Sequence, residues 1–368
     1  YGYAEMCLYL GQEDEYRRAR QALLARFGTS DSPQVAERTA RACLLLPASG
    51  NEMDRAVSLA GLAARVDPKN AGVIYPYFQF VKGFAEYRQG HFDQAIAAMR
   101  GDASKMYGPL PQLVLGMALH QTGREAEARK TLASAMLSHD WRENQVTGTD
   151  GWIRHVLRRE AERTILPNLA AVLDGTQRPR DNDERVAQIG GCRFENRFAA
   201  LSRIYAEAFA AEPKLAESHR LSAARVAVQA GCGRGSDVGS LGDVERRNWR
   251  TQARMWLRED LSAMSGGLGR DVTRARDHLR QTLTMWQSDP ELAGIRDPAE
   301  LERMHPNEKA DCQSLWSDVR ALIDSSSRPR GHETAVTLGS AHGPDCGRAR
   351  GVLINMASYA VGHWQASC

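Results

Sequence analysis

The sequence predicts an all-α protein built from repeated pairs of antiparallel helices. Two segments, 80–99 and 113–132, align at a constant offset of 33 residues, and a fixed period of this length is typical of a helical repeat. Apolar residues recur at helical spacing on both sides of this pair. We find no stretch in which apolar and polar residues alternate in a sustained way, so a sheet is not expected.

The aligned pair carries small residues where two helices must approach each other. The matching positions are Gly83 with Gly116, Gly90 with Gly123, and Ala95 with Ala128. The first pair allows close approach of two helix backbones, the second supplies the left-handed turn between helices, and the third avoids pushing the helices apart. This pattern resembles the tetratricopeptide repeat (TPR), which implies a right-handed superhelix of antiparallel helix pairs.

Weaker copies of the pattern flank this pair. They are "EDEYRRARQALLARF", "NEMDRAVSLAGLAARVDP" and "NRFAALSRIYAEAFAAEP", and in the last of them Leu201 replaces the small alanine of the repeat. Proline is tolerated in the first turn of a helix and cannot continue a preceding one. We therefore interpret five prolines as helix starts: Pro33, Pro68, Pro213, Pro290 and Pro298. Asp297 and Glu300 add the spacing of a capping box.

The helical pattern continues, less regularly, to residue 324. One predicted face holds Trp249, Ala253, Trp256, Leu257, Leu261 and Met264, and another holds Leu315, Trp316, Val319, Leu322 and Ile323. Breaks are expected at 144–150, 175–183, 231–242 and 265–269, where Gly, Asp, Asn or Arg gather. The predicted organisation is a TPR-like region at 1–174, a more irregular helical region at 175–324 with a hinge near Gly175, and a poorly ordered tail at 325–368.

Composition excludes several classes of protein. A chain with 42% hydrophobic and 25% charged residues is neither wholly disordered, nor collagen-like, nor a membrane channel. The formal charge of +3 does not indicate a nucleic-acid or anionic-membrane partner, and no apolar run approaches the ~20 residues of a membrane span. Seven cysteines without a C-x-x-C pair predict reduced, mostly buried thiols in a cytoplasmic protein.

Several sequence patterns resemble catalytic or binding sites, but we interpret each of them as part of the fold. The segment "GCGRGSDVG" (231–239) follows a helix-like segment rather than a strand, so it is interpreted as a loop between helices. The basic segment 152–166 interleaves Glu160 and Glu162, which predicts ion pairs on a solvated helix face. The seven tryptophans predict core packing, and the ten histidines lack metal-site spacing. No catalytic residue, cofactor or metal is therefore expected.

A more specific resemblance covers residues 15–324. The run "EYRRARQALLARFG", then "YPYFQFVKGFAEYRQGHFDQAI", "RHVLRREAE", "PRDNDER" and "DPELAGIRDPAELERM", resembles the C-terminal TPR region of planctomycete-type bacterial serine/threonine protein kinases. The resemblance implies a preceding kinase domain, and because the chain opens with Tyr1 rather than Met we expect a fragment of a longer polypeptide. The chain lacks the glycine-rich loop, catalytic loop and D-F-G motif of a kinase, so no phosphoryl transfer by this segment is expected.

The TPR resemblance places a partner-binding groove on the first helices of the two matched repeats. The expected groove residues are Tyr77, Phe80, Phe84, Tyr87, Arg88, Leu113, Met117, His120 and Gln121. Aromatic residues at these places favour an apolar or aromatic ligand over an acidic tail. The sequence thus predicts a signalling scaffold with a protein or peptide partner and no small-molecule ligand.

Two alternative functions remain open at this point. An all-α enzyme would need carboxylates that converge only in the fold, such as Glu160 and Asp183. A helical-repeat nucleic-acid binder would need a basic surface on one side, which the near-neutral balance of charges disfavours.

Overall fold

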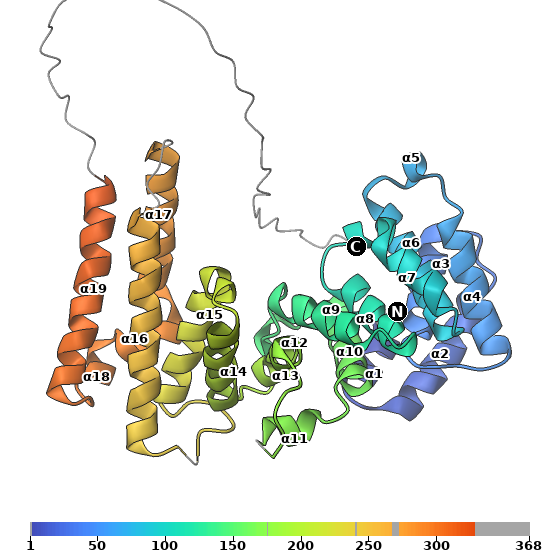
Figure 1. Ribbon diagram of the computed structural model, residues 1–368. Helices are drawn as coiled ribbons and strands as arrows, with labels where there is room; N and C mark the ends of the chain where they lie inside the picture. The colour runs from blue at the N-terminus through green and yellow to red at the C-terminus, as the bar shows by residue number, and fades with distance from the viewer. Residues whose placement is uncertain (1, 175, 240, 267–271, 328–368) are drawn as a thin grey trace, which may run out of the picture. The chain divides into compact units, whose positions relative to one another are not determined.

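The computed structural model describes residues 2–174, 176–239, 241–266 and 272–327. These residues form helices and connecting loops without any strand, which confirms the predicted all-α class (Figure 1). Residues 1–327 form one compact unit, and the second unit, 328–368, lies outside the described residues. Most of the predicted tail therefore carries no structural description, but its first residues, 325–327, belong to the last helix.

The first half of the unit consists of helices joined by short loops. They are α1 (Tyr3–Tyr9), α2 (Glu13–Phe27), α3 (Pro33–Cys43), α4 (Asn51–Ala64), α5 (Pro68–Ala71), η1 (Gly72–Ile74), α6 (Tyr75–Arg88), α7 (Phe92–Arg100), η2 (Asp102–Lys105), α8 (Leu110–Gln121), α9 (Glu125–Leu137), η3 (Glu143–Gln145) and α10 (Gly148–Ile165). Helices that are adjacent in the sequence pack against each other in pairs: α1 with α2, α3 with α4, α6 with α7, and α8 with α9. The two aligned segments of the sequence are the α6–α7 and α8–α9 pairs.

The repeat glycines of these two pairs occupy crowded or left-handed positions. A Cβ atom on Gly83 would lie 2.7 Å from Ala98 Cβ on α7, and a Cβ on Gly116 would lie 3.2 Å from Ile165 Cδ1. The turns at Gly90 and Gly123 have φ values of 80° and 77°, a region that residues with a side chain rarely adopt. Glycine therefore lets α6 and α7 pack closely at Gly83, makes room for Ile165 of α10 at Gly116, and permits the left-handed turns within both pairs.

Helix α10 joins the N-terminus of the chain to the repeats. It packs against α8 and against α1, so the first helix lies beside a segment that is distant in sequence. Arg159 Nη2 donates hydrogen bonds to the carbonyl oxygens of Leu8 and Tyr9, at 3.3 and 2.8 Å. These carbonyls lie in the last turn of α1, where the helical hydrogen-bond ladder ends, and Leu8 O also accepts from the backbone N–H of Gly11 at 3.1 Å. A cation at that end of the helix is favourable.

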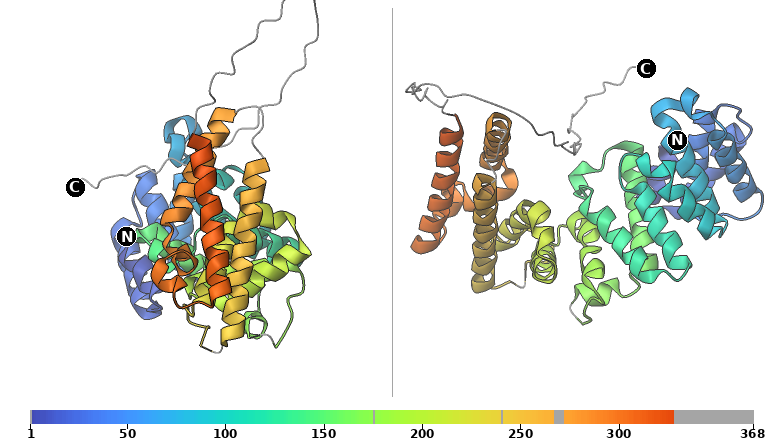
Figure 2. Two further views of the ribbon diagram at one scale, coloured as in Figure 1. Left: turned by 90° about the vertical axis from the view of Figure 1, so that its left-hand side faces the viewer. Right: turned by 45° about the horizontal axis from the view of Figure 1, so that its top comes forward.

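The second half contains longer helices linked through short ones. They are α11 (Leu169–Leu173), α12 (Asn182–Val186), α13 (Ile189–Phe194), α14 (Phe198–Ala211), α15 (Lys214–Gly231), α16 (Asp243–Gly266), α17 (Val272–Ser288), η4 (Pro290–Ile295), α18 (Pro298–Leu301) and α19 (Pro306–Ser327). Helix α12 packs on both α9 and α14, and α14, α15 and α16 pack in sequence. Helix α19 contacts both α16 and α17 (Figure 2).

Local sequence signals explain most helix starts. Four of the five predicted prolines stand in the first turn of α3, α5, η4 and α18, and Pro213 directly precedes α15. The predicted capping box of Asp297 and Glu300 is wrong, because neither carboxylate caps α18. Asp297 pairs with Arg296 and Glu300 pairs with Arg234, so each acidic group is held by a guanidinium instead.

None of the helices that the structure describes has the length and apolarity needed to cross a bilayer. The described residues between α11 and α12, and those between α15 and α16, coincide closely with two of the predicted breaks, 175–183 and 231–242. The predicted hinge residue, Gly175, lies outside the described residues.

Candidate functional site

The aromatic and aliphatic residues of the predicted groove belong to the core. Phe80, Phe84, Leu113 and Met117 are each 0% exposed, and the rings of Phe80 and Phe84 stack with their centroids 5.8 Å apart. Helices α3 and α4 cover α6, and α10 covers α8. These four side chains therefore hold helices together and do not present an accessible surface.

Arg88 also points into the protein, contrary to its expected role at a ligand. Its side chain is 3% exposed and donates hydrogen bonds to Glu160 of α10. It also donates to the carbonyl oxygens of Leu44 and Leu45 at the end of α3. The guanidinium connects three helices and has no free face for a partner.

The remaining predicted groove residues do not form one surface. Tyr87 is buried, and burial raises the pKa of its hydroxyl to about 12. Tyr77 and His120 are half-buried, and Gln121 is exposed. Of the nine predicted residues, Gln121 alone is fully accessible, so the structure closes the groove that the repeat pattern indicated.

The basic segment 152–166 is packed inside rather than solvated. Arg158 and Glu162 have side chains 3% and 7% exposed, and Arg158 Nη1 lies 2.7 and 2.6 Å from the two carboxylate oxygens of Glu162. His155 is 3% exposed, with its ring between those of Trp141 and Phe194. The predicted ion pairing exists, but the predicted solvated face is wrong because α1, α8 and α13 pack against α10.

Two other structural interpretations of the sequence are confirmed. Trp141, Trp256, Trp286 and Trp316 are buried, Trp152 and Trp249 are half-buried, and Trp364 lies outside the described residues. In the glycine-rich segment 231–239, Gly231 ends α15 and the described residues that follow lie in the connection between α15 and α16.

The cysteines that the structure describes are free thiols. Cys7, Cys43, Cys192 and Cys312 are buried and Cys232 is half-buried, while Cys346 and Cys368 lie outside the described residues. Burial raises the pKa of the thiols of Cys43 and Cys192 to about 12. Such thiols stay protonated near neutral pH and are poor nucleophiles.

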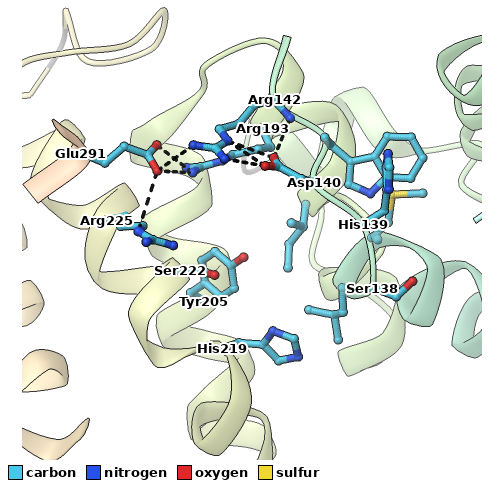
Figure 3. Close-up of a pocket in the computed structure, with 14 residues that line it drawn as sticks. Ser138, His139, Asp140, Arg142, Arg193, Tyr205, His219, Ser222, Arg225 and Glu291 are labelled. Atoms are coloured by element: carbon cyan, nitrogen blue, oxygen red, sulfur yellow. Dashed lines mark hydrogen bonds and ion pairs between the residues drawn. The ribbon is translucent and has the colours of Figure 1, made fainter. Parts of the chain in front are cut away.

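A polar cavity of about 250 Å³ lies where α9, α13, α14, α15 and η4 meet (Figure 3). Its lining is residues 136–142, Ile189, Arg193, Tyr205, His219, Ser222, Arg225 and Glu291. Three arginines from different elements gather around Glu291. Arg193 Nη2 lies 2.7 Å from Glu291 Oε1, and Arg142 and Arg225 lie 3.4 and 3.9 Å from Oε2. Sequence reasoning missed this cluster because its members share no local motif.

The charges of the polar cavity are paired with one another. Asp140 holds Arg142, and Asp289 holds Arg225 at 2.6 Å. Burial, together with the charge of Arg154, lowers the pKa of His139 to about 4, and burial lowers the pKa of His219. Both rings are neutral near pH 7. The cavity thus offers hydrogen-bonding groups and neutral rings without an unpaired charge for chemistry.

A second depression combines apolar side chains with arginines. This arginine-rimmed groove, about 710 Å³, lies among α11, the loop 177–179, α12 and α14. It is lined by Val172, Gln177, Arg178, Pro179, Arg185, Gln188, Arg203, Ile204, Glu207, Ala210 and Ala211. Arg185 pairs with Glu207 at 3.0 Å. Within the described part of the chain, Arg178 and Arg203 have no carboxylate within ion-pair distance.

The two carboxylates considered for an enzyme lie in different surroundings. Glu160 is held by Arg88, whereas Asp183 lines a separate depression with Lys130 and Glu212. Among the described residues, no three histidine, cysteine or acidic side chains gather in a way that would hold a metal ion.

Comparison of the chain with protein-family models and with curated proteins finds no match.

Proposed function

We propose that this chain is a TPR-like helical-repeat scaffold that binds a protein partner through the arginine-rimmed groove. Support for the scaffold comes from the equivalence of two helix pairs, α6–α7 and α8–α9, which repeat the same glycine positions 33 residues apart. In the proposal the chain is non-catalytic and serves as the partner-binding region of a longer serine/threonine protein kinase.

The occupant that suits the groove is an acidic peptide segment with interspersed apolar side chains. Val172 and Ile204 supply apolar contacts, and the rim carries three arginines against the single carboxylate of Glu207. Arg178 and Arg203 have no carboxylate partner among the described residues, although Arg203 Nη2 donates a hydrogen bond to the carbonyl oxygen of Leu173 at 3.2 Å. Their guanidiniums favour carboxylates, which a guanidinium binds in a two-pronged geometry. The expectation of an apolar or aromatic ligand is replaced, because the aromatic residues on which it depended are buried.

The groove is the observation that carries this proposal. An apolar side chain buried in such a groove contributes about 1.5–3 kcal/mol, and complementary charge increases the association rate. Apolar burial and complementary charge together suit the recognition of a short extended peptide segment by a helical-repeat surface.

The proposal is tested with a fluorescein-labelled peptide in which glutamate and leucine alternate. Fluorescence anisotropy at low ionic strength should show saturable binding to the full chain, and Arg203→Glu should weaken that binding about tenfold or more because it replaces attraction by repulsion. Arg178→Glu gives a second variant, in the loop 177–179 of the groove lining. Arg17→Glu is the matched control, because Arg17 is an exposed arginine on α2 far from the groove lining in sequence.

Two results would reject the groove as the partner site. One is equal binding of a peptide with lysine in place of glutamate. The other is wild-type affinity in folded Arg203→Glu and Arg178→Glu variants.

A further inference from the structure

An arginine-rich pocket lies in the second half of the unit, away from the groove lining. It is a cavity of about 350 Å³ at the end of α15, the start of α16, η4, α18 and the start of α19. Its charged lining consists of Arg246, Arg247, Arg250 and Arg303 against Asp243, Glu300 and Glu308. Neither the repeat pattern nor the resemblance pointed to this place.

Close backbone packing forms the floor of the arginine-rich pocket. A Cβ atom on Gly294 would overlap Cys232 Sγ, and a Cβ on Gly231 would lie 2.8 Å from the carbonyl oxygen of Arg246. Glycine at both positions lets η4 pack closely on Cys232 at the end of α15, and lets α15 pack closely on α16. The arginines of α16 are thereby held close to the residues that precede α19.

The two glutamates of the pocket are already shared among several arginines. Glu308 is 5% exposed, and its Oε1 lies 2.6 Å from Arg250 Nε and 3.3 Å from Arg254 Nη1. Burial alone would raise the pKa of Glu308, but the hydrogen bonds and charge of Arg250 outweigh burial and lower it. Glu300 pairs with Arg234 at 3.0 Å and with Arg303 at 3.7 Å. With Asp243 included, the lining holds four arginines against three carboxylates, so positive charge remains in excess at the pocket.

Arg246 has no acidic partner among the described residues. Its Nη2 reaches only the carbonyl oxygen of Val238, at 3.5 Å, and its Nε is buried without a hydrogen-bond acceptor. Arg247 lies 3.9 Å from Glu308, a weak contact, and Arg303 has a side chain 78% exposed. Three of the four lining arginines thus retain donor groups that an added anion would satisfy.

We propose that this pocket binds a phosphate group. A phosphate monoester is compact enough for the cavity, carries close to two negative charges near neutral pH, and has three oxygens that can each accept from a different guanidinium. The donors are the arginine side chains of α16 and of the α18–α19 loop, not the backbone of the glycine-rich segment 231–239. A carboxylate has fewer acceptor oxygens and half the charge, so it would leave more of these donors unsatisfied.

The site does not depend on the proposed scaffold function, because it shares no lining residue with the arginine-rimmed groove. Its ligand is either a free phosphate compound or a phosphorylated side chain of another protein. The experiment distinguishes the two sources with three probes: inorganic phosphate, a phosphoserine peptide, and the same peptide without phosphate.

Binding is measured on the full chain by calorimetry and by thermal unfolding at constant ionic strength, with chloride as the compensating salt. A ligand that binds the folded state raises the Tm. Arg246→Gln should weaken phosphate binding about tenfold or more, since it removes hydrogen bonds from a charged donor to a charged acceptor. Arg303→Gln gives a second variant at an exposed position that leaves the core intact.

Arg258→Gln is the control for charge. Arg258 lies on the same helix, α16, pairs with Asp318 at 2.9 Å, and lines no part of the pocket. It should keep wild-type affinity for phosphate. Tighter binding of the phosphoserine peptide than of inorganic phosphate would identify a phosphorylated protein as the ligand, and equal binding would identify a small phosphate compound.

The proposal is overturned if phosphate has no effect beyond that of chloride. It is equally overturned if Arg246→Gln and Arg303→Gln bind phosphate as tightly as the Arg258→Gln control. The groove test uses an unphosphorylated peptide, so failure of one proposal does not imply failure of the other.

Discussion

Arg88 and Glu160, separated by 72 residues, form a two-pronged ion pair in the interior of the helical unit. Arg88 Nη1 lies 2.5 Å from Glu160 Oε1, and Nη2 lies 2.8 Å from Oε2. Arg88 Nε also donates to Leu44 O at 2.6 Å. The pair fastens α6 to α10 and to the end of α3. It occupies the position at which the repeat pattern had predicted a ligand contact.

Replacing Arg88 with alanine should cost stability rather than ligand affinity. The change leaves the Glu160 carboxylate and two carbonyls without their donor, and breaking a buried ion pair typically costs about 3–5 kcal/mol. Urea unfolding measures the loss. Arg17→Ala, which breaks an exposed pair with Glu13, should cost less than about 1 kcal/mol. Equal losses in the two variants would contradict the buried arrangement.

Replacing glycine with alanine should change stability in opposite directions at two helical positions, Gly83 and Gly61. In Gly83→Ala the new Cβ would lie 2.7 Å from Ala98 Cβ, so α6 and α7 must separate and the protein should lose about 1–3 kcal/mol. In Gly61→Ala, within α4, the new methyl meets nothing within 4 Å. Alanine favours a helix by about 1 kcal/mol over glycine, so this control should be stabilised. Thermal unfolding of both variants would show the difference in sign.

His155 should make the folded state sensitive to acid. Burial first, and then the charge of Arg158, lower the pKa of His155 from 6.5 to about 3. Below pH 6.5 the unfolded chain takes up a proton that the folded chain excludes. Stability present above pH 6.5 is therefore lost as the pH falls towards the folded pKa. Each pKa unit corresponds to about 1.4 kcal/mol, so the loss between pH 7 and 4 is about 3 kcal/mol.

The variant that isolates this effect is His155→Phe. Its ring fits among the same aromatic neighbours, and His155 Nδ1 has no hydrogen-bond partner to lose. Urea unfolding at several pH values should show a smaller decrease in stability below pH 6.5 than in the wild type. Parallel pH profiles for the two proteins would argue against a buried neutral histidine.

Glu291 should be the most sensitive acidic residue of the polar cavity. Glu291→Gln removes the charge shared by three arginines and leaves Arg193, whose side chain is 13% exposed, without an anionic partner. We expect a loss of about 2–4 kcal/mol in the free energy of unfolding. Glu302→Gln removes an exposed partner of Lys309 and should change stability by less than about 1 kcal/mol. If Glu291→Gln loses no more unfolding free energy than Glu302→Gln, the charged cluster around Glu291 contributes little to stability.

Local sequence signals predicted the helices because their causes are local. Proline at the first turn of α3 and glycine at the turn after α6 act through the conformation of one or two residues. The helical spacing of Trp256, Leu257 and Leu261 likewise predicts a buried face from one helix alone, and the structure buries all three side chains.

Only the tertiary structure decided which faces became core and which charges found partners. Phe84 and Arg88 lie on a helix whose pattern is compatible with either a groove or a core, and the answer depends on α3, α4 and α10 packing over it. The same holds for Arg193 and Glu291, and for the arginines around Glu308. Ion pairs between segments distant in the chain require no spacing or motif, so their positions follow from how the helices pack and cannot be read from the order of residues.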